Sequence, residues 1–214
     1  AEELHAQDPE HYPDDNHKPE IAIALDRLEA LLGFETFENI VINIESNHEL
    51  KSFIGEESLL SLEKASSDDD SIRNVEVKRV FNGLFAKSLS DRDELKTLTA
   101  SMAQRLCAQN DLSARDQWFV NLQKTYPEGD IGLFCLYFLN YRVLERGDGV
   151  FLKADVPHAY LKGNIIECMA NSDNVVRAGL TPKFVDVENL AKIVLVECSP
   201  LVTQAAEDNG LGGE

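Results

Sequence analysis

Residues 138–169 read FLNYRVLERGDGVFLKADVPHAYLKGNIIECM, and this stretch decides the fold class. It contains short runs of strand-forming residues separated by glycine-containing turns; the runs are 138–144, 150–153, 159–161 and 165–169. The turn at 146–149 (RGDG) is typical of a β-hairpin, so we expect 150–153 to pair back onto 138–144. Short strands joined by glycine turns favour an antiparallel barrel or sandwich.

A further strand is predicted near the start of the chain. Apolar residues alternate with small alanines over 20–25, after a segment rich in turn signals. On such a strand Lys18 and Glu20 share one face with the alanines, because alternate side chains point the same way. Two charged groups followed by two small ones suit a face that lines a cavity, and the alternative is a solvent-facing strand edge.

Helices are predicted between these two strand regions, over about 36–125. Apolar residues recur there at the spacing i, i+3, i+4, i+7, which indicates four to six short amphipathic helices whose apolar sides serve packing. The clearest sets are Phe37, Ile40, Val41 and Ile44, and Val77, Val80, Phe81, Leu84 and Phe85. One more helix is predicted over 186–193, and residues 203–214 have no periodicity and are expected to be disordered.

The amino-acid composition and net charge argue against several classes of function. The 214 residues carry a net charge of −18, which disfavours nucleic acid as a partner, and an anionic ligand would need a local basic pocket. No apolar run reaches the roughly 18 residues of a membrane helix, and the acidic start does not resemble a signal peptide. Four cysteines occur without a CxxC pair, so free thiols and a cytoplasmic location are expected.

Three segments carry candidate chemistry. His158 and Tyr160 share a strand face, and His158 is either a zinc ligand or an ordinary core or surface histidine. Glu167 has apolar neighbours on both sides, and it is either a proton-transfer group or an outward-facing carboxylate on a half-solvated strand. The polar segment 172–184 places Arg177 and Lys183 where they can bind a phosphate, with a solvated loop as the alternative.

The order and wording of several motifs together resemble type I phosphomannose isomerases over roughly residues 1–190. The motifs are NHKPE (16–20), YPEGDIG (126–132), VPHAYLKG (156–163), IECMA (166–170) and SDNVVRAGLTPKF (172–184). The last motif is long and specific. The resemblance implies an α+β protein with an incomplete cupin-type antiparallel β-barrel and an all-helical insertion domain. The implied parts are 1–34 and 129–194 for the barrel with its following helix, 35–128 for the insertion, and 195–214 as an irregular tail.

The resemblance also implies a site and a reaction. Glu20 and His158 would bind one Zn²⁺, and Glu167, Lys18 and Arg177 would be catalytic. Tyr160, Asp173 and Lys183 would bind the substrate, a small-molecule sugar phosphate. Mannose 6-phosphate and fructose 6-phosphate would be interconverted through a cis-enediol, which supplies mannose for GDP-mannose synthesis, with Glu167 as the candidate base and Lys18 as the alternative.

In this family a Gln-x-His pair upstream of the segment that matches 1–5 supplies two further zinc ligands. We therefore expect weakened zinc binding and little activity for this chain, since two ligands fall below the usual three or four. One alternative function is a catalytically inactive cupin fragment that binds a sugar phosphate or a protein partner. Another is a helical interaction module, which requires an exposed apolar patch on the helices. The oligomeric state stays open.

Overall fold

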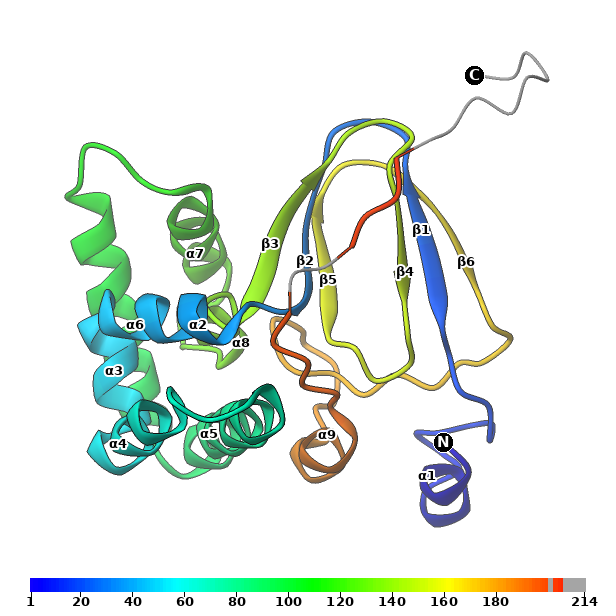
Figure 1. Ribbon diagram of the computed structural model, residues 1–214, viewed down its shortest axis with the longest axis horizontal. Helices are drawn as coiled ribbons and strands as arrows, with labels where there is room; N and C mark the ends of the chain where they lie inside the picture. The colour runs from blue at the N-terminus through cyan, green and yellow to red at the C-terminus, as the bar shows by residue number, and fades with distance from the viewer. Residues whose placement is uncertain (200–201, 206–214) are drawn as a thin grey trace. The chain divides into compact units, whose positions relative to one another are not determined.

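Six strands form two three-stranded sheets in the part of the chain that this computed structural model describes, residues 1–199 and 202–205 (Figure 1). The strands are β1 (Glu20–Ala24), β2 (Leu28–Phe34), β3 (Leu139–Leu144), β4 (Gly149–Leu152), β5 (His158–Lys162) and β6 (Ile165–Met169). One sheet has the order β4-β1-β6 and the other β3-β2-β5. Strand β1 pairs antiparallel with β4 and β6, and β2 pairs antiparallel with β5. The mixed class with antiparallel sheets is as predicted, and the sheets are not closed into a barrel.

The predicted hairpin pairing across 146–149 is wrong. The turn is present, but β3 and β4 belong to different sheets. Backbone hydrogen bonds explain this: the Gly147 amide donates to the Ala24 carbonyl over 2.8 Å, and the Ala24 amide donates to the Asp148 carbonyl over 2.9 Å. The turn therefore extends the pairing of β1 with β4. In the same way, the turn between β5 and β6 connects one sheet to the other.

Strand β2 has no counterpart among the predicted strands. Every residue from Leu28 to Phe34 is buried, so the segment lacks the alternation of apolar and polar residues that indicates a half-exposed strand. Two short helices were also not predicted, α1 (Glu2–Gln7) in the segment rich in turn signals and α8 (Gly132–Cys135) in the region expected to be strands.

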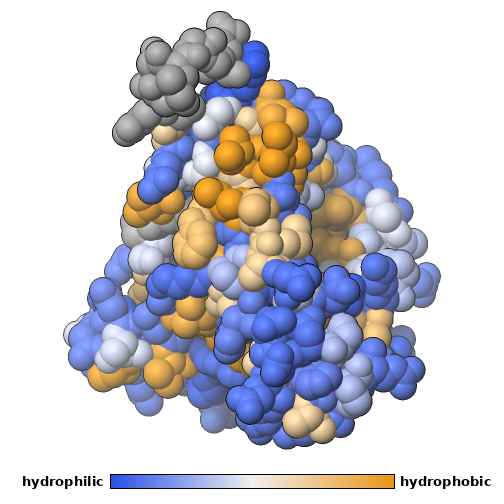
Figure 2. Space-filling view, turned by 90° about the vertical axis from the view of Figure 1, so that its right-hand side faces the viewer, coloured by the Kyte–Doolittle hydropathy of each residue, from blue (hydrophilic) through white to orange (hydrophobic). Residues whose placement is uncertain are grey.

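The core of the strand region is built from small and branched aliphatic side chains. Its members are Ala22, Ala24, Leu28, Ala30, Leu32, Leu144, Val150 and Leu152. Strand β1 turns its alanines toward this core and its two isoleucines toward solvent. Figure 2 shows apolar surface on the strand region. On the solvent side of the β4-β1-β6 sheet, the exposed apolar residues include Ile21, Ile23, Phe151 and Ile166. We call these four residues the outer apolar face.

Six helices occupy the region predicted to be helical, in agreement with the sequence. They are α2 (Phe37–Glu45), α3 (His48–Ile54), α4 (Glu56–Ala65), α5 (Asp70–Ser90), α6 (Arg92–Cys107) and α7 (Ala114–Thr125). Their apolar stripes are buried as expected, and aromatic rings fill the centre, with the rings of Phe34 and Phe85 each 5.0 Å from that of Phe81. Helix α9 (Val187–Ile193) also forms where predicted.

The chain divides into two compact units. The strand unit comprises 1–32, 141–175 and 202–205, and the helical unit comprises 33–140 and 176–199, of the residues described. The domain boundaries given above stay predictions. In the expected tail, Gln204 forms a backbone bridge with Gly149, and residues 206–214 lie outside the described residues.

The cysteines and the helices bear on two expectations from the composition. All four cysteines are free thiols, as expected. No helix among the residues described is both long enough and apolar enough to cross a membrane.

Candidate functional site

Three potential metal-binding side chains converge in the strand unit. Glu20 lies on β1, Glu167 on β6 and His158 on β5, and one ligand atom of each lies within 4.8 Å of the other two. The antiparallel register sets Glu167 opposite Ala22, so Glu167 and Glu20 project toward the same face of their sheet. His158 comes from the other sheet, and its Nε2 is 3.1 Å from Glu20 Oε2. We call these three residues the Glu-His-Glu cluster.

A backbone contact of His158 leaves its other ring nitrogen facing the cluster. His158 Nδ1 is 2.9 Å from the carbonyl oxygen of Val156. Because a carbonyl only accepts, Nδ1 must carry the proton and donate. Because the backbone engages Nδ1, Nε2 is the nitrogen that faces Glu20 and is available to bind a metal.

Tyr160 lies beside the cluster, with its ring centroid 5.8 Å from that of His158. Burial raises the pKa of its phenol above the ordinary value of 10, and the negative charge of Glu167 raises it further. The hydroxyl is buried, and the Glu167 carboxylate is the hydrogen-bonding group that faces it. Tyr160 is therefore a protonated donor beside the carboxylate of Glu167.

Lys18 supplies positive charge next to the cluster. Its Nζ is 3.7 Å from Glu20 Oε1, and its side chain is only 19% exposed. Two carboxylates and one neutral imidazole are donors that suit a divalent cation such as zinc. The Tyr160 hydroxyl, buried beside Glu167, adds a further polar group at the same place. The residues present therefore fit a metal with a polar ligand beside it.

The first residues of the 172–184 motif are fixed to the chain start by Asp14. The Asp173 amide donates to Asp14 Oδ2 over 2.9 Å, and the Asn174 side chain donates to the Asp14 carbonyl over 2.7 Å. The bond from Asp173 holds the pKa of Asp14 below its ordinary value. Asp173 itself is exposed. Sequence reasoning missed Asp14, whose only signal is its place in a predicted turn.

The predicted site residues fall into two groups. Lys18, Glu20, His158, Tyr160 and Glu167 lie together in the strand unit. Arg177 and Lys183 belong to the helical unit, and their approach to the cluster stays a prediction. Arg177 is half-buried, whereas Lys183 is exposed and its amide donates to Thr181 Oγ1 over 3.1 Å.

Comparison with known proteins gives consistent matches. The sequence model for the catalytic domain of phosphomannose isomerase type I matches residues 1–37, and that for the family's helical insertion domain matches 53–139. Mannose-6-phosphate isomerase of Rattus norvegicus is 42% identical over 202 residues, which cover 94% of this chain and 48% of the relative. The Homo sapiens enzyme of the same name is 42% identical over 196 residues, 91% of this chain and 46% of the relative.

Solved structures agree with the sequence matches. A K86A mutant of phosphomannose isomerase from Salmonella typhimurium superposes with a TM-score of 0.75 at 29% identity, covering 98% of this chain and 52% of that one. A mannose 6-phosphate isomerase bound with zinc and yttrium gives a TM-score of 0.71 at 30% identity, covering 93% of this chain and 49% of that one. The chain thus spans about half the length of the relatives that it matches.

Proposed function

This chain belongs to the type I phosphomannose isomerase family, and from that premise we propose that its Glu-His-Glu cluster is part of a zinc-dependent aldose–ketose isomerase site. The substrates would be mannose 6-phosphate and fructose 6-phosphate. The observation that carries the proposal is the convergence of Glu20, His158 and Glu167 within 4.8 Å, from three strands of two sheets. Glu20 is far in sequence from the other two residues, so the tertiary fold, rather than a single helix, strand or turn, brings the three together.

Zinc is the metal we propose for the cluster. Glu20 and His158 would hold it, through a carboxylate oxygen and through Nε2, the nitrogen that the Val156 contact leaves available. A similar solved isomerase is bound with zinc and yttrium. When bound, zinc would supply polarisation of the sugar carbonyl and orientation of the neighbouring oxygen.

Glu167 is the residue we propose to move the proton. Its carboxylate would take the proton from C2 of the open-chain aldose, leaving the enediolate of a cis-enediol. A proton would then pass from the C2 oxygen to the C1 oxygen, and the carboxyl group would return the carbon proton to C1 to give the ketose. The proton count balances because the carboxyl group returns the proton that it takes, and the hydroxyl proton only changes from one oxygen to the other. Lys18 is the alternative base, and in its charged form it would offset the negative charge of Glu20 over their 3.7 Å contact.

The remaining residues would bind the sugar phosphate. The Tyr160 hydroxyl stays protonated, because its pKa is raised, and it would donate to a sugar oxygen. Asp173 would accept from a sugar hydroxyl, and Arg177 and Lys183 would hold the phosphate. Mannose 6-phosphate formed in the ketose-to-aldose direction would feed GDP-mannose synthesis in the cytoplasm, a reducing compartment that suits four free thiols.

Zinc content and turnover, measured together, separate the role of Glu167 from that of the ligands. With excess Zn²⁺, Glu20→Gln and His158→Ala should lose bound zinc, whereas Glu167→Gln should keep zinc and lose at least about 100-fold in turnover of mannose 6-phosphate. The exposed Glu10→Gln is the matched control and should change neither quantity.

Two results would contradict the proposal. Loss of zinc from folded Glu167→Gln would make Glu167 a ligand and remove it as the base. Zinc binding without any turnover in the unmodified chain would favour the alternative function, a non-catalytic fragment that binds a sugar phosphate.

A further inference from the structure

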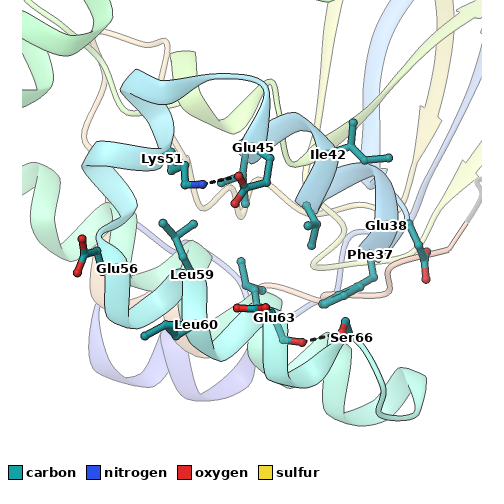
Figure 3. Close-up of a pocket in the computed structure, with 13 residues that line it drawn as sticks. Phe37, Glu38, Ile42, Glu45, Lys51, Glu56, Leu59, Leu60, Glu63 and Ser66 are labelled. Atoms are coloured by element: carbon teal, nitrogen blue, oxygen red, sulfur yellow. Dashed lines mark hydrogen bonds and ion pairs between the residues drawn. The ribbon is translucent and has the colours of Figure 1, made fainter.

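The helical unit has an apolar groove that the isomerase proposal does not use. Its cavity of about 680 Å³ lies within the range of ligand-binding pockets. Residues of α2, α3 and α4 line it, as Figure 3 shows. Phe37, Ile44 and Leu62 contribute buried side chains, while Ile42 and Leu60 are 58% and 55% exposed. The groove therefore exposes large apolar side chains to solvent.

The two longer walls of the groove repeat one pattern. On α2, Glu38 and Glu45 flank an adjacent pair of apolar residues, and on α4, Glu56 and Glu63 flank another. In each wall the two glutamates are seven residues apart, which is two helical turns or about 10.5 Å along the axis. An apolar centre with a carboxylate at each end thus occurs twice, once on either side of the groove.

The carboxylates of the two walls differ in their partners. Arg73 Nη1 lies 3.1 Å from Glu38, and Lys51 pairs with Glu45. Glu56 and Glu63 of α4 make no ion pair with any residue that the structure describes. The α4 wall is therefore left with two unneutralised charges in a chain whose net charge is already −18.

We propose that this groove binds a basic amphipathic helix of a partner protein. An apolar pair at i+3 and i+4 would enter the groove between Leu59 and Leu60 of α4 and the apolar pair of α2. Lysine or arginine at i and i+7 would meet Glu56 and Glu63, because the two spacings are equal. The acidic field of the whole chain would speed the approach of such a cation-rich segment.

A synthetic peptide tests this recognition directly. A labelled 16-residue alanine-based helix with leucine at i+3 and i+4 and lysine at i and i+7 should bind the full chain, as fluorescence anisotropy would show. Glutamate in place of both lysines should weaken binding at least about tenfold, as should serine in place of both leucines. Binding of the lysine peptide should also weaken with added salt.

Paired variants of the chain locate the site. Glu63→Lys should weaken binding of the lysine peptide roughly fivefold, whereas Asp111→Lys, the same charge change at an exposed position between α6 and α7, should not. Leu60→Ser should weaken it roughly tenfold, whereas Val75→Ser, at a residue 69% exposed outside the groove, should not. Circular dichroism of each variant confirms that it is folded.

Several outcomes would overturn the proposal. Equal binding of the lysine and glutamate peptides would remove the electrostatic basis, and equal weakening by Glu63→Lys and Asp111→Lys would place binding elsewhere. Self-association of the chain, measured by sedimentation and abolished by Leu60→Ser, would make a second copy the occupant of the groove.

Discussion

Glu49 is the charged side chain most enclosed by its surroundings in the helical unit, with 1% of it exposed. Arg105, on α6, binds it with Nη2 2.8 Å from Oε2 and Nε 2.9 Å from Oε1, and also binds Asn47 Oδ1 over 2.9 Å. Burial alone would raise the pKa of Glu49, but the hydrogen bonds from Arg105 outweigh it and lower that pKa below 4.5. The pair joins α3 to α6, so its charge state affects stability.

Glu49→Gln should lower the free energy of unfolding at pH 7 by about 2 kcal/mol, because the charged hydrogen bonds are weakened. A lowered pKa in the folded state stabilises above pH 4.5, and that contribution is lost as the pH falls through the folded-state value. The difference between the two proteins should therefore shrink toward pH 3 in urea titrations. Glu188→Gln, which removes an exposed pair with Lys192, should cost less than about 0.5 kcal/mol. A constant difference across pH would contradict the role given to Glu49.

At this scale the sequence predicts side-chain direction better than side-chain partners. Strand alternation correctly placed His158 and Tyr160 on one face, and their rings lie 5.8 Å apart. The contact of His158 with the Val156 carbonyl depends on the bend before β5, and no periodicity indicates it. Glu20 and His158 lie 138 positions apart on strands of different sheets, so their meeting could be proposed only from the resemblance to a known family.

Among the connecting elements, the turn between β5 and β6 most directly sets the geometry of the Glu-His-Glu cluster, because His158 and Glu167 lie on those two strands. Gly163 has φ +125° in this turn. A Cβ there would lie 2.8 Å from the Arg27 carbonyl oxygen and 2.9 Å from Leu28 Cα, which are backbone atoms that cannot move alone. The position therefore requires glycine for both its backbone angle and its space.

Gly163→Ala should lower the free energy of unfolding by about 2 kcal/mol through strain and crowding. It should also weaken zinc binding, since the two strands would shift relative to each other. Gly83→Ala is the matched control: a Cβ there meets nothing within 4 Å, and alanine should stabilise α5 by up to about 1 kcal/mol. Denaturant unfolding of both variants gives the comparison, and equal effects of the two changes would refute the explanation.

The sequence predicts those helices and strands that are buried on one face and exposed on the other. The helices of 36–125 carry a periodic apolar stripe and were recognised, as was the Val187–Ile193 helix. Strand β2 is buried along its whole length and lacks that signal. The pairing of β4 was wrongly predicted because a local turn motif does not reveal that β1, far earlier in the chain, offers a competing edge.

Over the molecule as a whole, strong acidity coexists with an uncovered apolar area on the strand unit (Figure 2). The register places Phe151 beside Ile21, and Ile166 beside Ile23, so the outer apolar face is continuous across three strands. Charge repulsion between copies opposes association through this face and weakens as salt screens it.

Phe151→Lys should therefore reduce concentration-dependent light scattering at high salt, because Phe151 is the most exposed of the four residues of that face, at 61%. Leu89→Lys provides a control, since Leu89 is 55% exposed on α5 and lies outside the strand unit. Equal reductions in the two variants would show that added charge, rather than the face itself, is responsible. The expected measurement is the second virial coefficient of each protein at several salt concentrations.

The interruption of the strand unit by the helical unit has a consequence during synthesis on the ribosome. Strand β1 pairs with β6, whose residues emerge about 140 positions later, on the order of ten seconds at ordinary elongation rates. Until β4 is translated, β1 has neither of its two neighbours, whereas α2 to α7 are by then complete. Nascent chains paused before β4 would thus present an aggregation-prone, chaperone-accessible strand ahead of a folded helical segment.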